Sequence, residues 1–160
     1  MSVRIAIVTV SDGCAAGTRE DRSGAAIAAW AREQGHEVTA HVVVPDETHR
    51  VATALIRLAD GGEATLILTT GGTGLGPRDV TPEATRAAIE RDAPGIAEAL
   101  RSAGLRQTPR AALSRGIAGT RGSALIINLP GSTSGVLDGL ATLAPLVEHV
   151  AALLRGETEH

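Results

Sequence analysis

The sequence has almost no aromatic residues and no lysine. Phe and Tyr are absent, and Trp30 is the only tryptophan among 160 residues. The core must therefore be built from Val, Ile, Leu and Ala, which favours close packing of helices on a sheet. All 15 basic residues are Arg, which excludes a Walker P-loop lysine, Schiff-base chemistry and a lysine general base. Biased codon usage explains the missing lysine better than selection on a site.

Cysteine and positive charge are also scarce. Cys14 is the only cysteine, so an internal disulfide and a cysteine-based zinc cluster are excluded. We interpret Cys14 as a small buried apolar residue rather than a reactive thiol. The formal net charge of -3 argues against nucleic-acid binding. The five histidines have no spacing that would direct two of them to one metal ion.

Long apolar runs are missing as well. No segment approaches the length of a membrane span, and residues 1–4 lead into a strand rather than a signal peptide. We therefore predict a cytoplasmic protein without a membrane partner. A length of 160 residues suits one domain, which we place at residues 1–156, followed by a polar tail at 157–160.

Strand and helix patterns alternate along the first 70 residues. Apolar, β-branched runs predict strands over 3–10, 37–44 and 64–69. Amphipathic patterns that end at glycine predict helices over 21–35 and 48–61. Strands that alternate with helices in this way are typical of a parallel α/β sheet.

The second half of the sequence predicts more helices and a hairpin. Two residues separate the last two strands, so one strand is expected to run antiparallel to the others. We predict a three-layer α/β/α fold with a mostly parallel sheet and one antiparallel strand. The predicted elements are helices over 82–91 and 94–103, a helical turn over 110–114, strands over 115–120 and 123–129, and a final helix over 136–154 that Pro145 kinks or divides.

The most informative stretch runs from the third strand into a glycine-rich loop. Four glycines lie between residues 71 and 76, where they allow positive φ and close approach of a ligand to backbone N–H groups. A glycine-rich turn between a strand and a helix commonly binds phosphate. Thr81 and Pro82 then predict a helix start, with Thr81 as N-cap and Pro82 as the first helical residue. A purely structural turn is the alternative.

Four loops are predicted to meet at the carboxyl ends of the parallel strands, where α/β proteins bind ligands. These loops are Ser11–Asp12, Pro45–Glu47, Gly71–Asp79 and Pro130–Ser134. Together they carry three aspartates, several hydroxyls, an arginine and two glycine-containing turns. This composition suits a phosphate-bearing ligand together with a divalent cation, because the cation can bridge carboxylate and phosphate oxygens.

The charged residues of this rim also have simpler structural interpretations. Asp12 could merely end a strand, and Asp46 could be a turn residue or a helix cap. Asp79 could form a structural ion pair with Arg78 or Arg115.

Ser132 and Thr133 could likewise only cap the final helix. A capping role and phosphate binding are compatible, because both use the unpaired N–H groups of the first helical turn.

Five ordered motifs in this sequence resemble the molybdenum cofactor biosynthesis Mog/MoaB family. The glycine-rich stretch carries the family signature, and the likeness extends over nearly the whole chain. The matching segments are Val10-Ser11-Asp12 with Asp21-x-Ser23-Gly24, Val44-Pro45-Asp46-Glu47, Thr69–Gly74 with Arg78–Thr85, Leu113-Ser114-Arg115, and Ile127–Gly131.

The resemblance implies molybdopterin adenylyltransferase activity, in which AMP passes from Mg-ATP to the terminal phosphate of molybdopterin and pyrophosphate is released. It implies that Asp46 and Asp79 are the essential carboxylates, and we expect them to hold Mg²⁺ between the phosphates. A non-catalytic molybdopterin-binding protein of the same fold is the alternative; a generic nucleotide-binding regulatory module is a third.

The resemblance also implies a binding surface and partners. The family is typically trimeric, so a homotrimer is expected, with hand-over of the product to the molybdate-insertion enzyme. The predicted binding residues for molybdopterin and ATP are Ser11, Asp12, Gly71, Gly72, Thr73, Gly74, Arg78, Ser114, Arg115, Pro130, Gly131, Ser132 and Thr133.

Overall fold

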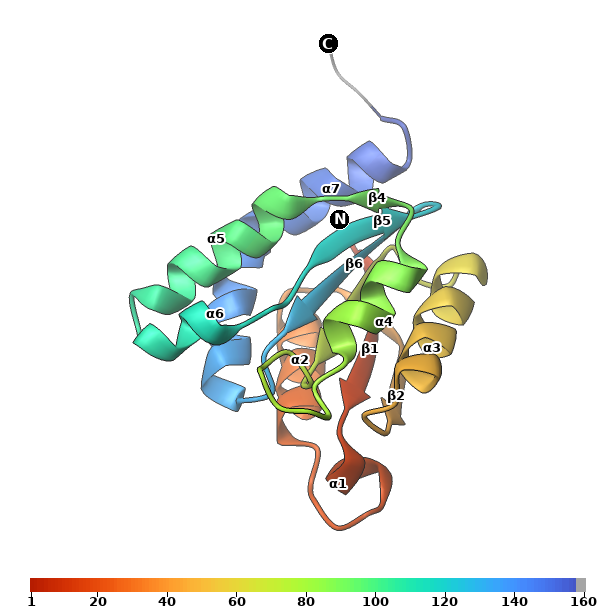
Figure 1. The fold of residues 1–160 in the computed structure, drawn as a ribbon. Coiled ribbons are helices and arrows are strands. Elements are labelled where there is room, and N and C mark those ends of the chain that lie inside the picture. The colour runs from red at the N-terminus through yellow and green to blue at the C-terminus, as the bar shows by residue number, and fades with distance from the viewer. Residues whose placement is uncertain (158–160) are drawn as a thin grey trace.

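A computed structural model describes residues 1–157 of the chain. One six-stranded sheet, in the order β2-β1-β3-β6-β5-β4, is covered by helices on both faces (Figure 1). The strands are β1 Arg4–Val10, β2 Glu37–Val44, β3 Leu66–Thr70, β4 Arg91–Asp92, β5 Ala118–Arg121 and β6 Ala124–Leu129. The helices are α1 Asp12–Ala15, α2 Arg22–Glu33, α3 Thr48–Asp60, α4 Thr81–Ala88, α5 Pro94–Leu105, the 3-10 helix η1 Pro109–Leu113, α6 Thr133–Leu143, the 3-10 helix η2 Ala144–Leu146 and α7 Val147–Leu154.

The sheet has the predicted pattern of strand directions. Strands β2, β1, β3 and β6 pair in parallel, whereas β5 runs antiparallel to both of its neighbours, β6 and β4. The three-layer α/β/α prediction with one antiparallel strand is therefore confirmed. All the parallel strands end at the same edge of the sheet, which brings their following loops together.

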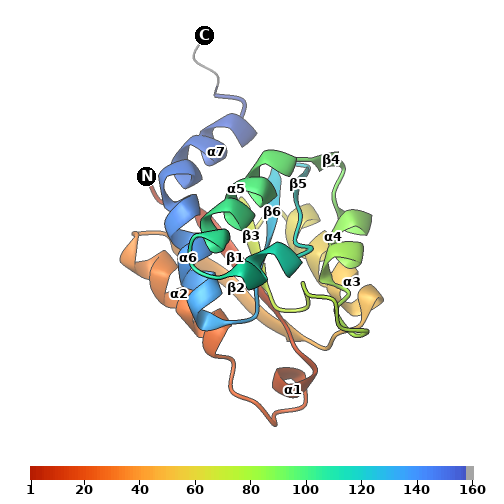
Figure 2. The same ribbon diagram turned by 60° about the vertical axis from the view of Figure 1, so that its left-hand side comes forward.

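The residues of β1 alternate between two apolar cores. Ile5 and Ile7 face the core beneath α2, α5, α6 and α7, whereas Ala6 and Val8 face the core beneath α3 and α4. Figure 2 shows these two groups of helices on opposite sides of the sheet. Both faces of the central strands are thus buried, as the continuous apolar runs of the sequence predict.

Two predicted boundaries in the first two-thirds of the chain were wrong. The helix predicted to reach Arg91 ends at Ala88, because Arg91 and Asp92 pair with β5 as the short strand β4. The loop predicted after Asp12 instead contains the helical turn α1, whose N-cap Ser11 accepts from the Cys14 N–H through its side chain.

The final helix is divided at Pro145, as predicted, but its length and hydropathy differ from what we expected of this sequence. The combined run Thr133–Leu154 has a mean hydropathy of 1.4 and is long and apolar enough to cross a membrane by length and composition. The prediction that no segment approaches such a length was therefore wrong. Core helices of soluble proteins pass the same test, and Val136, Leu140 and Val147 of this run are buried against the sheet.

The predicted polar tail at 157–160 lies, apart from Glu157, outside the described residues. Gly156 adopts a φ of 78° and follows the end of α7, which is the conformation expected of a helix-terminating glycine.

Candidate functional site

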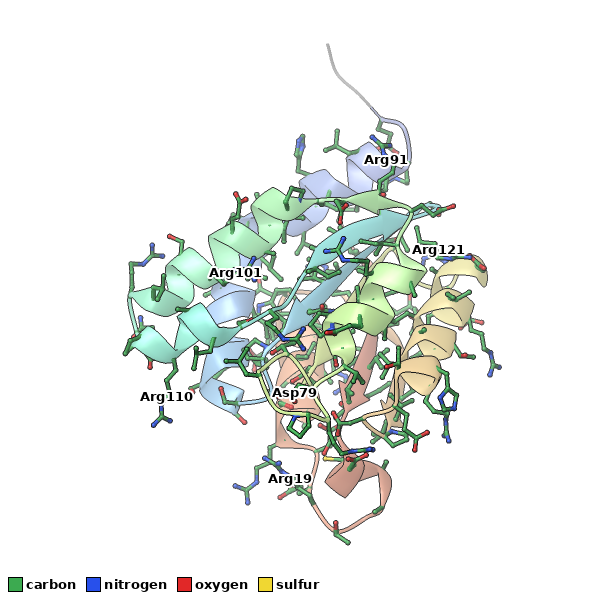
Figure 3. The ribbon with its side chains drawn as sticks, in the orientation of Figure 1. Arg19, Asp79, Arg91, Arg101, Arg110 and Arg121 are labelled. Atoms are coloured by element: carbon green, nitrogen blue, oxygen red, sulfur yellow. The ribbon has the colours of Figure 1, made fainter. Side chains whose placement is uncertain are left out.

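A cleft of about 680 Å³ opens at the carboxyl edge of the sheet. The glycine loop 71–79 and the loop that joins β6 to α6 form its inner side, whereas α5, η1 and α6 form its outer side. Figure 3 places Asp79 in the glycine loop and Arg101 on α5. The cleft therefore lies where the sequence predicts a phosphate-bearing ligand.

Two positions in the glycine loop require glycine. Gly71 and Gly72 have φ angles of 97° and 69°, in the left-handed region that side chains disfavour. A Cβ on Gly71 would lie against the Val10 carbonyl oxygen, and a Cβ on Gly72 would lie against the Thr81 hydroxyl. The backbone at these positions is thus packed directly on the end of β1 and on the start of α4.

Thr81 fixes the loop in a way that differs from the prediction. It was predicted to be the N-cap of α4, but Val80 occupies that position, and no side chain of the described residues caps the helix. The Thr81 hydroxyl instead donates to the Gly71 carbonyl oxygen at 2.8 Å, and its N–H donates to the Gly72 carbonyl oxygen at 3.1 Å. Pro82, predicted to be the first helical residue, is the second, because α4 begins at Thr81.

The loop presents a row of unpaired backbone donors to the cleft. Among residues 1–157, no hydrogen bond engages the N–H groups of Gly72, Thr73 or Gly74, and all three residues line the cleft. Consecutive N–H groups of this kind form an anion-binding concavity. They can hold a phosphate oxygen without a lysine.

A second set of donors begins α6. Ser132 is its N-cap and accepts from the N–H of Gly135 at 3.2 Å, so the capping alternative for Ser132 is confirmed. In the part of the chain that the structure describes, the N–H groups of Thr133 and Ser134 have no partner. Because these groups lie at the positive end of a helix of 11 residues, they favour an anion.

The two sets of donors are tied together. The Thr70 hydroxyl donates to the Pro130 carbonyl oxygen at 2.7 Å, and the Gly71 N–H donates to the Leu129 carbonyl oxygen at 3.2 Å. A Cβ on Gly131 would lie 3.3 Å from Gly71 Cα. The glycine loop and the β6–α6 loop therefore form one continuous lining.

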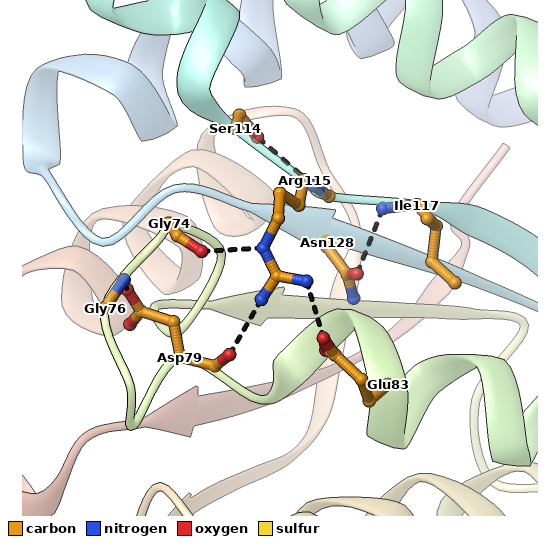
Figure 4. A network of polar contacts seen from close by, with 9 residues as sticks. Gly74, Gly76, Asp79, Glu83, Ser114, Arg115, Ile117 and Asn128 are labelled. Carbon is orange, nitrogen blue, oxygen red and sulfur yellow. Dashed lines mark hydrogen bonds and ion pairs between the residues drawn. The ribbon is translucent and has the colours of Figure 1, made fainter.

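Arg115 supports the glycine loop from behind (Figure 4). Its guanidinium donates to the carbonyl oxygens of Gly74 and Asp79, each at 2.8 Å, and forms an ion pair with Glu83. The backbone N–H of Arg115 donates to the Thr73 carbonyl oxygen at 2.8 Å. Arg115 was predicted to contact substrate, but the structure assigns its guanidinium to the loop and not to the lining of the cleft.

The Asp79 carboxylate lies over the loop and is not in an ion pair within the described residues. Its Oδ2 accepts from the Gly76 N–H at 2.9 Å. A Cβ on Gly74 or Gly76 would approach this oxygen to 2.9 or 2.8 Å, so both glycines make room for it. The predicted alternative, an ion pair with Arg78 or Arg115, was wrong, because those arginines have other partners.

Asp12 joins the first loop to the second. Its N–H donates to Asp46 Oδ2 at 2.8 Å, and the Asp46 N–H donates to Asp12 Oδ1 at 3.0 Å. Arg78 binds both oxygens of Asp12, at 2.7 and 3.0 Å. The bond to Arg78, followed by the backbone N–H of Asp46, lowers the pKa of the Asp12 carboxyl.

Asp46 has the opposite electrostatic character. Burial raises the pKa of its carboxyl, and the charges of Asp12 and Asp79 add to this effect. The helix-cap alternative for Asp46 was wrong, because Glu47 is the N-cap of α3 and makes no side-chain capping bond. Asp46 Oδ1 lies 3.2 Å from the position of a Cβ on Gly72, so this oxygen faces the glycine loop.

Some of the remaining predicted residues line the cleft and others do not. Ser114 lines the cleft, where its hydroxyl accepts from the Gly116 N–H at 3.3 Å. Pro130, Gly131 and Ser132 also line it. The predicted residues outside its lining, besides Arg115, are Ser11, Asp12, Asp46, Gly71, Arg78 and Thr133. Ser11 caps α1 by accepting from the N–H of Cys14 at 3.1 Å. Cys14 itself, predicted to be buried, is only partly buried.

Sequence reasoning missed a group of residues that the fold brings to the cleft. Asn128 is 4% exposed; its amide donates to Thr69 and Thr85 at 3.0 and 2.9 Å, and its oxygen accepts from the Ile117 N–H at 3.1 Å. The signal was present, because a buried amide inside an apolar strand must be hydrogen-bonded. The other missed residues are Arg101, Gln107 and Asp138, and no local pattern points to them.

The oxygen donors present fit Mg²⁺ bound together with phosphate. Within residues 1–157 no cluster of three or more His, Cys, Asp and Glu could hold a metal by itself. Asp46 and Asp79 each have one carboxylate oxygen bound by a backbone N–H and one oxygen with no protein partner in this part of the chain. One or two carboxylates, completed by phosphate oxygens and water, are what Mg²⁺ takes in nucleotide sites.

The family of the chain follows from comparison with known proteins. Residues 6–149 match the model of the probable molybdopterin binding domain. The chain is 36% identical, over 97% of its length and 89% of the relative's, to a molybdopterin adenylyltransferase of Helicobacter pylori. It is 44% identical to a molybdenum cofactor biosynthesis bifunctional protein of Synechococcus elongatus, over 94% of this chain. The chain spans only 47% of that relative, and 26% and 49% of matched relatives from Drosophila melanogaster and Chlorobaculum tepidum.

Solved structures agree with the sequence comparison. The molybdopterin biosynthesis enzyme MoaB of Thermus thermophilus superposes with a TM-score of 0.90 at 47% identity, covering 96% of this chain and 97% of that one. The molybdopterin biosynthesis Mog protein of Mycobacterium ulcerans superposes with a TM-score of 0.89 at 39% identity, covering 98% and 99%. The fold, the five ordered motifs and these relatives lead to one conclusion: the chain belongs to the molybdopterin-binding domain family that contains the Mog and MoaB proteins.

Proposed function

We propose that this protein is a molybdopterin adenylyltransferase that transfers AMP from Mg-ATP to the terminal phosphate of molybdopterin. The observation that carries the proposal is the pair of adjoining anion-binding surfaces in one cleft. One consists of the N–H groups of Gly72–Gly74, and the other of the N–H groups of Thr133 and Ser134 at the start of α6, of which Ser134 lines the cleft. A reaction between two phosphate-bearing molecules needs two such surfaces side by side.

AMP transfer requires the protein mainly to position the two phosphate groups and to neutralise their negative charge. A phosphate oxygen of molybdopterin attacks the α-phosphorus of ATP, a new P–O–P bond forms, and the bond to the bridging oxygen breaks with release of pyrophosphate. A phosphate dianion is already deprotonated, so no general base is needed. Catalysis then depends on in-line placement and on neutralisation of negative charge, which is consistent with a sequence that has no lysine.

The carboxylates Asp46 and Asp79 would hold Mg²⁺ from two neighbouring loops. When bound, the ion supplies positive charge to the phosphate oxygens of ATP. Asp12 and Gly76 orient the two carboxylates through backbone N–H groups. Arg115 holds the loop that carries Asp79, so the distance between the carboxylates is set by the fold.

Molybdopterin is proposed to lie across Gly71–Gly74, Ser114 and the Pro130–Thr133 loop, with its terminal phosphate at one of the two anion-binding surfaces and the α-phosphate of ATP at the other. Ser114 and the glycine loop line the same cleft side by side, because the N–H of Arg115, the next residue after Ser114, donates to the Thr73 carbonyl oxygen. We further propose a cytoplasmic homotrimer that passes adenylylated molybdopterin to a molybdate-insertion enzyme. Sedimentation equilibrium tests the trimer: a monomer mass at micromolar concentration would contradict that part of the proposal.

The activity is tested with the purified chain, molybdopterin, ATP and Mg²⁺. We expect adenylylated molybdopterin and pyrophosphate in equal amounts, and none when Mg²⁺ is replaced by a chelator. Retained molybdopterin binding without product would contradict the proposal and support the non-catalytic binding protein.

A further inference from the structure

The outer part of the cleft contains two polar side chains that the proposed reaction does not use. Gln107 follows α5, and Asp138 lies on α6. Both line the cleft, and both also line a shallower hollow that adjoins it between α5 and α6. The two side chains therefore belong to the wall that the cleft shares with this hollow, and no residue of the glycine loop lines the hollow.

Neither side chain is engaged by the protein. Across residues 1–157, no hydrogen bond or ion pair involves the Asp138 carboxylate or the Gln107 side-chain amide. By contrast, the Arg101 guanidinium on the same side donates to the carbonyl oxygens of Ser114 and Gly116, at 3.3 and 2.7 Å. Arg101 holds the wall together, whereas Gln107 and Asp138 keep their hydrogen-bonding capacity for a ligand.

The surroundings of Asp138 suit a flat ring. The cleft that it lines is also lined by Gly135 and Gly139 and by the side chains of Ala97, Leu100 and Ala111. Small and aliphatic groups leave room for a heterocycle and bury its faces. A carboxylate at the edge of such a slot accepts two parallel N–H donors from a planar group.

We propose that Asp138, assisted by Gln107, recognises the 2-amino-4-oxo pyrimidine edge of a pterin. This edge carries an exocyclic amino group and a ring N–H side by side, which match the two oxygens of one carboxylate. The adjacent carbonyl oxygen accepts from the Gln107 amide. Adenine offers one amino group beside an acceptor nitrogen, so it cannot bind the carboxylate through two donors. The inference rests on the proposed function, because it identifies this part of the cleft as the pterin end.

The test compares the binding of free pterin and of lumazine, in which an oxygen replaces the 2-amino group. Pterin fluorescence and calorimetry give both dissociation constants. We expect the unaltered protein to bind pterin about tenfold or more tightly than lumazine, because a lost charged hydrogen bond typically weakens binding to this extent. In Asp138→Asn this preference should fall to about twofold or less, and Gln107→Ala should weaken both ligands.

Glu98→Gln provides the matched control. Glu98 is an exposed carboxylate on α5 that does not line the cleft, so its loss should leave the pterin preference unchanged. An unchanged preference in Asp138→Asn would overturn the proposal, and so would an unaltered protein with no preference or no pterin binding. AMP transfer is measured separately. If AMP is transferred but the preference for pterin over lumazine is the same in Asp138→Asn, only this inference is contradicted. If the preference depends on Asp138 but no AMP is transferred, only the adenylyltransferase proposal is contradicted.

Discussion

The inner and outer sides of the cleft hold their polar groups in opposite ways. On the inner side, the Gly76 N–H orients the Asp79 carboxylate, and next to this lining the Asp12 N–H orients the Asp46 carboxylate and the Arg115 guanidinium binds loop carbonyl oxygens. On the outer side, the side-chain amide of Gln107 and the carboxylate of Asp138 have no partner among residues 1–157. The inner side is arranged before any ligand arrives, whereas the outer side is completed by the ligand.

This difference corresponds to two kinds of recognition. Charge stabilisation in a transition state depends on groups that are already in place, because reorganisation during the reaction costs free energy. Selection of a heterocycle depends on polar groups that stay unpaired when the wrong ligand binds. Substitutions on the inner side should therefore change turnover, and substitutions on the outer side should change the choice of ligand.

Asp79→Asn should have the largest effect on turnover. It keeps the shape of the side chain and its bond from the Gly76 N–H but removes a charge at the phosphates. We expect AMP transfer to fall by about 10²- to 10³-fold, the range typical of losing one preorganised electrostatic group, with molybdopterin binding and the folded structure retained. Near-normal turnover in a steady-state assay would remove Asp79 from the mechanism.

Asp46→Asn should lower turnover similarly but should not lower stability. The pKa of the Asp46 carboxyl is raised in the fold, so its contribution to stability is present below its ordinary value of 3.8 and is lost as the pH rises through the folded pKa. At pH 7 the ionised Asp46 carboxyl therefore lowers the stability of the fold, and Asn removes this unfavourable charge.

Thermal unfolding at two pH values measures this effect. We expect the melting temperature of Asp46→Asn to equal or exceed that of the unaltered protein at pH 7, and the difference to shrink below pH 4. A clear loss of stability at pH 7 would show that the carboxylate charge is compensated in the free protein.

Arg115→Lys should give a smaller but combined loss. Lysine cannot reach the carbonyl oxygens of Gly74 and Asp79 and the Glu83 carboxylate at once, because it lacks the planar fork of arginine. We expect the free energy of unfolding to fall by about 1–3 kcal/mol and turnover to fall by about tenfold. Arg91→Lys is the control, because Arg91 is exposed and remote from the cleft; equal losses in both variants would refute a supporting role for Arg115.

Glu83→Gln should have the smallest effect. Its side chain is 52% exposed, and exposed ion pairs contribute only about 0.2–1 kcal/mol. Chemical denaturation should detect this change, whereas turnover should stay within about twofold. A large loss of turnover would mean that Glu83, and not the two carbonyl contacts, determines the position of Arg115.

Local sequence patterns predicted the inner side of the cleft well. Glycines in succession after an apolar strand allow few backbone conformations, and the loops that follow parallel strands must meet at one edge. The cleft-lining positions of Gly72–Gly74 and Pro130–Ser132 were predicted in this way, whereas Ser114 was expected only from the resemblance to the Mog/MoaB family. Thr81 was misassigned because its hydroxyl is captured by the Gly71 carbonyl oxygen, a tertiary contact that competes with capping.

The outer side could not be predicted. Gln107 and Asp138 are separated by 31 positions and neither belongs to a motif; only the packing of α5 on α6 brings them together. Local patterns also could not predict that Arg78 pairs with Asp12 and not with its neighbour Asp79. Adjacent residues on a loop point in different directions, so sequence proximity does not decide which charges pair.

The bonds that join Thr70 to Pro130 and Gly71 to Leu129 continue the pairing of β3 and β6 beyond the sheet. The register of these two strands, in which Thr70 lies opposite Leu129, therefore sets the spacing between the two phosphate-binding surfaces. A slip of one residue would displace one surface by about 3.3 Å, as far as the whole separation of two reacting atoms before bond formation. The alignment of two strands, normally considered a matter of folding, thus sets the distance between the two bound substrates.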